Sequence, residues 1–328
     1  MTAASLGRRI FLSVSCTLLL CTAGIATAAE VKFATFNAEF LTRPRIHVKF
    51  GLPFDLAEAT PADQAQWQNQ AFRDSKFAEA VEHVADAIVR INADVLALQE
   101  VGNQQDVDQL AAAVLAKGLN YPHRALCQCT DTFTTQHVAV FSKLPIAETL
   151  PQIAGREMYD RELDDDDTEA DTGVSKGMRV KLNAQGREVF LYVAHLTSER
   201  GGHDADEQRI AQASIIRRHY LPLLNEGKDI IVAGDLNDHR GQPAIKRIRG
   251  RDDIWDDLLE TGEAPFFDQA QLGTRWTYEF MGVRSQLDHI LVSRSLRTNS
   301  SSVRAETIDV GDPLASDHRS FIVRINLP

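Results

Sequence analysis

The sequence contains only four cysteines in 328 residues, too few for a scaffold that depends on disulfides. Two of them lie within the first thirty residues, so only Cys127 and Cys129 remain in the rest of the chain. A four-ligand thiolate zinc site needs more sulfur than these two residues supply. A bridge across one intervening residue closes a very small loop and adds little stability. The sequence therefore leaves open whether the two cysteines are bridged.

Long apolar runs are also rare. Residues 10–25 form one, but it is too short and too interrupted to span a membrane. Arg8 and Arg9 precede it, and a small-residue cleavage pattern follows at 26–28, which is the layout of a secretory signal. The letters RRIFL favour the bacterial twin-arginine type, with a plain Sec signal as the alternative. We predict a signal over residues 1–29 and an exported protein, secreted or periplasmic.

Positive charge is scarce in the remainder of the chain, residues 30–328, which we assign to a single domain. Without Arg8 and Arg9 the chain holds 33 basic and 46 acidic residues, a formal charge of −13. A protein that attracts a polyanion through bulk charge carries the opposite sign. Any phosphate chemistry must therefore depend on local cations, meaning metal ions and a few placed Arg and Lys side chains.

The hydrophobic pattern predicts strands that alternate with helices early in the domain and with loops later. The expected helices cover residues 77–91, 106–117 and 205–221. The expected strands cover residues 31–37, 94–100, 137–142, 177–182, 188–195, 229–235, 286–293 and 320–325. We expect irregular surface over residues 41–70 and a solvated acidic insertion over 159–171, in which Asp164 to Asp167 could hold calcium. This order favours two sheets with outer helices over a repeat array or a regular barrel.

Polar side chains gather at the ends of six predicted strands. They are Asn37, Glu100, His195, the pair Asp235 and Asn237, Asp288, and the pair Asp317 and His318. Taken singly, each has an ordinary explanation, since Asn and Asp are common turn residues. Six such endings in one chain are harder to explain in this way, because ligands of layered α/β folds bind where strand ends converge.

The segments that carry these residues resemble the endonuclease/exonuclease/phosphatase superfamily, the fold of pancreatic-type deoxyribonuclease. They are FATFNAEFL, LALQEV, VAHLTS, VAGDLND, QLDHILVS and SDHRSF, in the order of the family. The segment FSKLPI is also similar to a strand and turn of the family. The resemblance covers nearly all of the chain after residue 30. It implies a four-layer α/β sandwich of two packed mixed sheets flanked by helices, and metal-dependent hydrolysis of a phosphoester.

By this resemblance, Glu100 is the principal metal ligand, with Asn37 beside it and Asp317 as a further ligand. The residue types agree with this role, because hard oxygen donors suit Mg²⁺, Mn²⁺ or Ca²⁺ and provide no soft ligand for zinc. Neighbouring carboxylates repel each other by roughly 1–4 kcal/mol per pair near a surface. A bound cation removes this repulsion and polarises a phosphoryl oxygen.

The resemblance also implies the catalytic groups. Asp235 and Asn237, one residue apart, point the same way on an extended backbone and would orient the attacking water and the phosphate. His318 would contact the phosphate or take a proton from water, while Asp288 holds its ring in one tautomer. Whether Asp235 or His318 is the base stays open at this point.

His195 matches the second histidine of the deoxyribonuclease branch, where it would protonate the leaving oxygen. The acidic partner of that histidine falls near Gln136 in this sequence, where no carboxylate stands. This departure puts the acid role of His195 in doubt.

Substrate contacts are less specific in the sequence. Arg275, Trp276 and Tyr278 lie about ten residues before the QLDH segment, and an arginine with aromatics suits a phosphate and a base. Trp276 and Tyr278 suit core or rim packing equally well. Lys176 and Arg179 are the other candidate phosphate contacts.

These observations predict an exported, metal-dependent phosphodiesterase, a nuclease acting on nucleic acid, and a monomer without stable membrane insertion. The first alternative is a phosphoesterase that acts on a phospholipid headgroup or a sugar or inositol phosphate. An exposed apolar hairpin would favour membrane lipids, and none is convincing in the sequence. The second alternative is a catalytically inactive binding protein of the same fold, which the complete set of site residues argues against.

Overall fold

The computed structural model describes residues 29–161, 169–184, 186–251, 255–256, 258–297 and 303–327. The predicted signal, apart from its last residue, and the acidic run from Asp164 to Asp167 lie outside the described residues. Among the helices of the described part, none is both long and apolar enough to cross a membrane.

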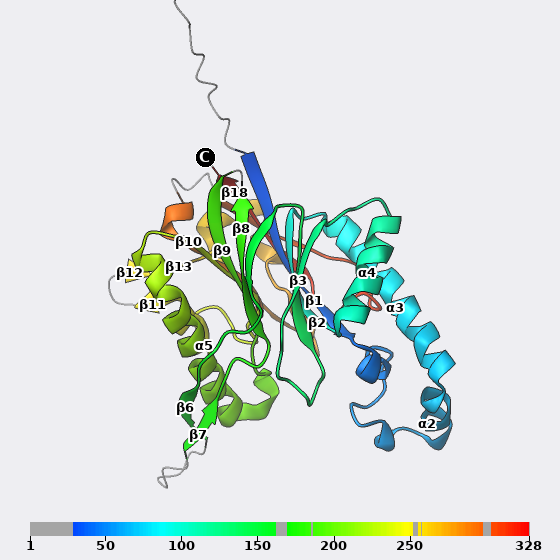
Figure 1. Cartoon of the computed structure of the whole chain (residues 1–328). Helices are drawn as coiled ribbons and strands as arrows, with labels where there is room; N and C mark the ends of the chain where they lie inside the picture. Colours follow the sequence, from blue (N-terminus) through cyan, green and yellow to red (C-terminus); the bar gives the residue numbers. More distant parts are fainter. Residues whose placement is uncertain are drawn as a thin grey trace, which may run out of the picture.

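Two six-stranded sheets pack face to face in the middle of the molecule (Figure 1). The first sheet has the order β17 (Val303–Ile308), β18 (Ser320–Leu327), β1 (Ala29–Leu41), β2 (Val95–Val101), β4 (His137–Ser142) and β3 (His123–Leu126). The second sheet has the order β13 (Leu258–Glu260), β16 (Asp288–Ser293), β10 (Asp229–Asp235), β9 (Arg187–His195), β8 (Gly177–Ala184) and β5 (Ile146–Leu150). In each sheet one central pair, β1–β2 and β9–β10, is parallel, and the other pairs are antiparallel.

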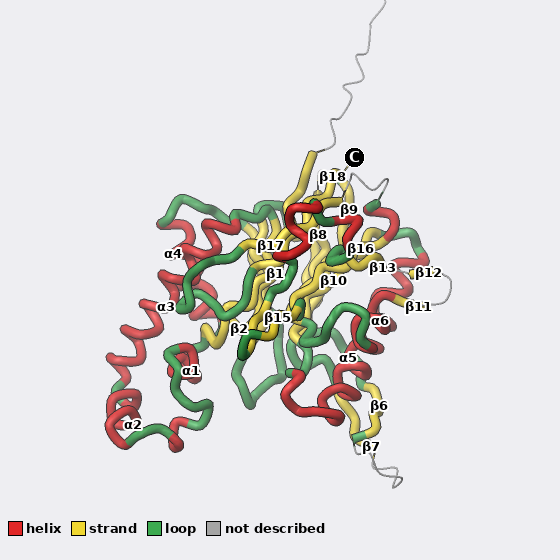
Figure 2. The backbone as a smooth tube through the Cα atoms, turned by 180° about the vertical axis from the view of Figure 1, so that it is seen from behind, coloured by secondary structure: helices red, strands yellow, loops and turns green. Residues whose placement is uncertain are grey.

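Helices cover the outer faces of both sheets (Figure 2). The first sheet packs against α3 (Gln70–Ile91) and α4 (Gln104–Ala116), and the second against α5 (Gly202–Asn225) and α6 (Pro243–Arg249). The predicted four-layer sandwich is therefore confirmed.

Alternation along the strands explains why these runs are apolar on both faces. In β1, Phe33 enters the core between the two sheets, while Phe36 packs in the core under α3 and α4. In β10, Ile231 and Ala233 face the other sheet, and Val232 faces α5. Because both faces of each sheet are buried, the sequence of a central strand is a continuous apolar run. Polar residues are therefore found at the ends of these strands.

The remaining elements are short. They are α1 (Ile46–Lys49), α2 (Pro61–Gln68), the strand pairs β6 (Glu157–Asp160) with β7 (Glu169–Thr172), β11 (Gly250–Arg251) with β12 (Trp255–Asp256), and β14 (Tyr278–Phe280) with β15 (Val283–Ser285), and the 3₁₀ turns η1 (Arg43–Arg45), η2 (Leu56–Glu58), η3 (Glu199–Gly201), η4 (Ala264–Phe266), η5 (Gln269–Thr274) and η6 (Arg294–Leu296). A disulfide joins Cys127 and Cys129 just after β3, which settles the point that the sequence leaves open.

The predicted helices and strands correspond to α3, α4, α5 and eight strands of the two sheets, with bounds that shift by a few residues. The prediction of irregular surface over residues 41–70 is wrong in part, because α1, α2 and the start of α3 fall there. Pro61 stands in the first turn of α2, where its missing N–H costs nothing, and Thr60 caps that helix. The predicted acidic insertion also contains ordered backbone, since β6 and β7 pair within it.

The hairpin of β14 and β15 carries an apolar tip, which corrects the sequence-based expectation. Phe280, Met281 and Val283 are all exposed there. In the sequence, they form the short run 280–283, interrupted only by Gly282 and flanked by Glu279 and Arg284. The turn between the two strands places this run at the surface.

One glycine of the second sheet has a clear steric role. Gly234 in β10 has φ +149°, and a Cβ atom at this position would lie 1.8 Å from the carbonyl oxygen of Ala194 in β9. Only glycine therefore allows the two strands to approach closely immediately before Asp235.

We predict that Gly234→Ala lowers the free energy of unfolding by at least about 2 kcal/mol, because the backbone of β9 must move. Gly273→Ala is the matched control, since a Cβ there meets nothing within 4 Å, and it should change stability by less than about 0.5 kcal/mol. Urea unfolding followed by circular dichroism measures both. Equal stability of the two variants would refute the steric role.

Candidate active site

A cleft of about 630 Å³ opens where the carboxyl ends of the central strands of both sheets meet. The predicted site residues that line it are Glu100, Lys176, His195, Asp235, Asn237, Tyr278, Asp317 and His318. Asn37 and Asp288 lie directly behind these residues, each in contact with one of them. The structure thus brings together the six polar strand ends of the sequence.

Asn37 connects the carboxylates of the two sheets. Its Nδ2 donates to Glu100 Oε1 at 3.0 Å and to Asp235 Oδ2 at 2.9 Å. Glu100 also accepts from the backbone N–H of Phe40 at 2.8 Å, and from the side-chain amide of Gln136. The amide of Asn37 therefore keeps one oxygen of each carboxylate close to the other.

Local backbone distortions turn these side chains toward the cleft. Glu100 has φ +58° beside a register shift between β2 and β4, and Asn237 has φ +49° just after β10. Glu39 and Phe40 also lie in the left-handed region, at φ +44° each. Bulges and left-handed residues are common next to active sites, where they redirect a side chain away from the regular ladder.

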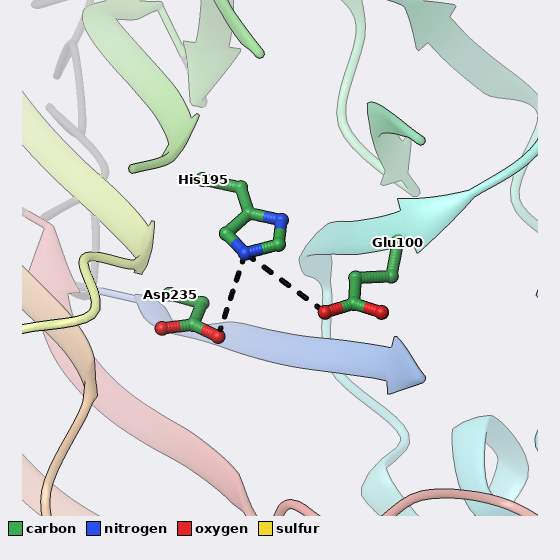
Figure 3. A group of neighbouring side chains, drawn as sticks. All are labelled: Glu100, His195 and Asp235. Atoms are coloured by element: carbon green, nitrogen blue, oxygen red, sulfur yellow. Dashed lines mark ion pairs between the residues drawn. The ribbon is translucent and has the colours of Figure 1, made fainter. Parts of the chain in front are cut away.

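His195 lies between the two carboxylates (Figure 3). Its Nε2 is 3.9 Å from Glu100 Oε1 and 3.9 Å from Asp235 Oδ2. Burial lowers the pKa of His195 well below its usual value, and the positive charges of Lys176 and His318 lower it further. Its Nδ1 has no hydrogen-bond partner within the described part of the chain, in agreement with the missing acidic partner near Gln136.

Asp235 is buried at the wall of the cleft. Burial, followed by the nearby charge of Asp288, raises the pKa of Asp235 to about 7. Ligand atoms of Glu100, His195 and Asp235 all lie within 4.8 Å of one another. Two close carboxylates, one of them too buried to ionise easily, fit a divalent cation, because a cation stabilises the charged form of both.

His318 forms a buried pair with Asp288. Its Nδ1 lies 2.7 Å from Asp288 Oδ2, and its Nε2 points toward Asp235 Oδ2 at 3.8 Å. Burial by itself lowers the pKa of His318, but the adjacent carboxylate of Asp288 outweighs it, and the pKa is raised well above the usual value. The ring of Tyr278 packs against this imidazole with centroids 4.8 Å apart. The structure therefore holds a positive charge in the cleft.

Two charged residues beside the site, Glu39 and Lys49, are not among the predicted site residues. Lys49 is buried, and its Nζ donates at 3.0 Å to the carbonyl oxygens of Ala38, Glu39 and Ala315. Burial, then the charges of Asp317 and other neighbours, raises the pKa of Glu39 to about 7 despite the opposing effect of Lys49. Glu39 could have been predicted, because it belongs to the FNAE segment at the end of the first strand. Lys49 could not, because it lies in residues 41–70, where the sequence predicted irregular surface.

Of the predicted substrate contacts, Lys176 and Tyr278 lie in the cleft. Lys176 Nζ donates to Gln136 Oε1 at 3.3 Å and lies 3.5 Å from Asp131 Oδ2. The hydroxyl of Tyr278 accepts from Arg200 at 3.2 Å. Both residues therefore stand where a substrate would enter.

The other three candidates lie elsewhere. Arg179 points to the outer side of β8, where it pairs with Glu148 and lies over Phe190, so it is not a substrate contact in this structure. Strand alternation explains this placement, since its neighbours on both sides face the inter-sheet core. Trp276 is covered by two arginine side chains, as core or rim packing predicts. Neither Trp276 nor Arg275 is among the described residues that line the cleft.

The profile of the Endonuclease/Exonuclease/phosphatase family matches residues 34–318. The chain belongs to this family. Its members are metal-dependent phosphoester hydrolases, so the predicted family and enzyme class are confirmed. No curated protein sequence matches the chain.

Solved structures of low sequence identity share the fold. A truncated TDP2 from Caenorhabditis elegans is 15% identical, with a TM-score of 0.55 over 90% of this chain and 97% of that one. A family protein from Bacteroides vulgatus is 15% identical, with a TM-score of 0.54 over 92% and 100%. A mutant beta toxin from Staphylococcus aureus with bound magnesium ions is 15% identical, with a TM-score of 0.52 over 90% and 99%.

We predict that Asp288→Asn lowers the proton affinity of His318 at least about tenfold in metal-free protein, because a neutral amide no longer stabilises the buried imidazolium. Histidine titration by ¹⁵N NMR measures this change. Asp108→Asn, an exposed change on α4, is the control and should leave the titration of His318 as it is.

The same pair has a consequence for stability. A folded-state pKa above the unfolded value stabilises the protein fully below pH about 6.5, and this contribution is lost as the pH rises through the folded value. Asp288→Asn should remove this pH-dependent contribution. An unchanged His318 titration in that variant would contradict the pairing.

Proposed function

We propose that this protein is an exported, divalent-metal-dependent phosphodiesterase that hydrolyses nucleic acid. Two neighbouring contacts support the proposal. The side-chain amide of Asn37 donates hydrogen bonds to both Glu100 and Asp235, and His318 pairs with Asp288 beside them at the same cleft. Export rests on the signal layout of residues 1–29. A monomer remains our expectation.

The metal would be held by Glu100, with Asp317 as a further oxygen donor at the cleft. Asn37, the other predicted ligand, turns its Nδ2 toward both carboxylates and its Oδ1 toward the backbone N–H of Glu39, so it would position the carboxylates. Hard oxygen ligands favour Mg²⁺, with Mn²⁺ or Ca²⁺ as alternatives. When bound, the ion supplies Lewis-acid polarisation of a phosphoryl oxygen.

The protein's own residues divide the proton chemistry between them. His318 keeps its proton beside Asp288, so it binds a negatively charged phosphate oxygen rather than accepting a proton. Asp235, whose pKa is raised to about 7, is the better base for the attacking water. Asn237 orients the substrate near Asp235. His195 is neutral and lacks an acidic partner for Nδ1 in the described structure, so we do not assign it the acid role.

A second candidate is a phosphoesterase for phospholipid headgroups. The apolar tip of the β14–β15 hairpin favours it, since this tip lies next to Tyr278 at the cleft. Exposed apolar side chains beside an active site can enter the surface of a bilayer.

We predict that EDTA abolishes hydrolysis of bis(p-nitrophenyl) phosphate and that added Mg²⁺ or Mn²⁺ restores it. Glu100→Gln and His318→Ala should each lower kcat/KM at least about 100-fold, because each removes a group that stabilises charge at the phosphate. The matched controls are Glu82→Gln and His83→Ala, which change surface residues of α3. Activity that survives the chelator would count against the proposal.

The substrate class is tested with a panel of plasmid, single-stranded DNA, RNA, sphingomyelin and inositol phosphates, each with Mg²⁺, Mn²⁺ or Ca²⁺. We expect the nucleic acids to be hydrolysed fastest. Faster hydrolysis of sphingomyelin or an inositol phosphate would replace the nuclease with the second candidate.

A further inference from the structure

Two exposed aromatic rings, on segments far apart in the chain, stand at the cleft and at the groove next to it. Phe133, in the segment between β3 and β4, is 70% exposed and lines the cleft. Phe280, in β14, is 50% exposed and lies beside the cleft residue Tyr278. Large exposed rings near a site usually mark a binding surface, because their burial by a ligand is favourable.

On the side of the first sheet, three rings form a row that ends at the cleft. The centroid of Phe54 lies 6.1 Å from that of Phe40 and 4.9 Å from that of Phe133. The guanidinium of Arg45 lies 4.2 Å from the centre of the Phe54 ring and donates to the carbonyl oxygen of Phe133. These contacts hold Phe133 in place while most of its surface stays open to solvent.

On the side of the second sheet, Tyr278 and Phe280 are stacked. Their rings are nearly parallel, with an interplanar angle of 5° and centroids 6.5 Å apart. Arg200 lies 5.4 Å from the centre of the Phe280 ring and donates to the hydroxyl of Tyr278. Because Tyr278 also packs on His318, this stack leads directly from the catalytic groups to the surface.

The charges around the cleft decide which contacts would dominate. The groove beside Phe280 contains Arg200 and Arg209, but Arg209 is paired with Asp206, and Glu199 and Glu207 also line the groove. A long row of phosphate contacts is therefore absent from this side of the described structure, and the chain as a whole is strongly acidic. Base stacking on aromatic rings needs no such row and tolerates any base sequence.

We propose that the cleft takes a single-stranded nucleic acid and that its bases on the two sides of the scissile phosphate stack on Phe133 and Phe280. Bases in a duplex are already stacked and paired, so they cannot offer their faces to these rings. The inference rests on the proposed function, since it names the substrate class of that same site.

A membrane is the competing occupant, because Met281 and Val283 are exposed next to Phe280. The two aromatic groups, however, come from two separate segments near the catalytic residues, and each includes an arginine over a ring. Stacked rings next to an arginine are suited to bind the bases and phosphates of a single strand. Insertion into a membrane would instead need a continuous apolar surface.

The experiment uses Phe133→Ala, Phe280→Ala and the double variant in the full chain. Binding is measured by anisotropy of a labelled single-stranded oligonucleotide and of the matched duplex, with Ca²⁺ present, and kcat/KM is measured with Mg²⁺. We expect the wild type to prefer the single strand, each variant to bind it about tenfold more weakly, and the double variant about 100-fold. Hydrolysis of bis(p-nitrophenyl) phosphate should fall by less than hydrolysis of the oligonucleotide.

Leu115→Ala is the control, because Leu115 is also apolar and 56% exposed but lies on α4, away from this cleft. It should bind the oligonucleotide like the wild type. Thermal unfolding identifies any variant that fails to fold, and Phe133→Leu and Phe280→Leu then replace it, since they keep an apolar side chain but lose the ring.

Three results would overturn the inference. The first is a wild type that hydrolyses bis(p-nitrophenyl) phosphate but binds the single strand and the duplex equally well. The second is a set of ring variants that bind the oligonucleotide as tightly as Leu115→Ala does. Either result would overturn the stacking of bases and leave the proposed hydrolysis intact. Binding to phosphatidylglycerol vesicles that is lost in Phe280→Ala would assign the hairpin to a membrane instead. If the wild type hydrolyses no phosphodiester with any of the three metals, the proposed function itself fails.

Discussion

The site depends on keeping two carboxylates close together in a place with little water. Glu100 and Asp235 come from different sheets, and the side-chain amide of Asn37 donates to both. Without a positive partner such an arrangement is unfavourable, since burial and mutual repulsion both oppose ionisation. The imidazolium of His318 offsets part of this repulsion, and a bound cation would offset the remainder. The polar end of β10 therefore forms part of a candidate metal site with Glu100 and His195.

The fold produces this closeness through the packing of its two sheets. The parallel pairs β1–β2 and β9–β10 lie at the centres of the sheets, so their carboxyl ends meet at one edge. Two further bonds fix the segment before His318 against β1: Ser316 Oγ donates to the carbonyl of Asn37 at 2.7 Å, and Lys49 reaches the carbonyl of Ala315. These bonds join segments more than 250 residues apart in the chain. Together with an antiparallel β-bridge between His318 and Tyr278, they position His318.

Much of the fold was predictable because the strands are buried on both faces. The bounds of β4 and β10 agree with the predicted strands, since apolar branched residues end abruptly at polar ones there. The short elements were not predictable in the same way. Prolines in residues 41–70 resemble loop signals, although Pro61 begins a helix. The apolar tip of the β14–β15 hairpin is a run of only four residues, 280–283, and no local pattern indicates that it is exposed. Arg179 has the right charge for a phosphate contact, but the strand alternation turns it away.

The sequence by itself determined the chemistry: which strand ends carry carboxylate, amide and imidazole groups, and the family to which that order of motifs belongs. These features are local, because each depends on residue type and on the few residues around it. The packing of distant segments set which pKa values are raised or lowered, placed Lys49 and Glu39 beside the site, and left exposed aromatic rings at the cleft and at the groove next to it. Those properties depend on burial and on distances between segments far apart in the chain, and no local pattern records either quantity.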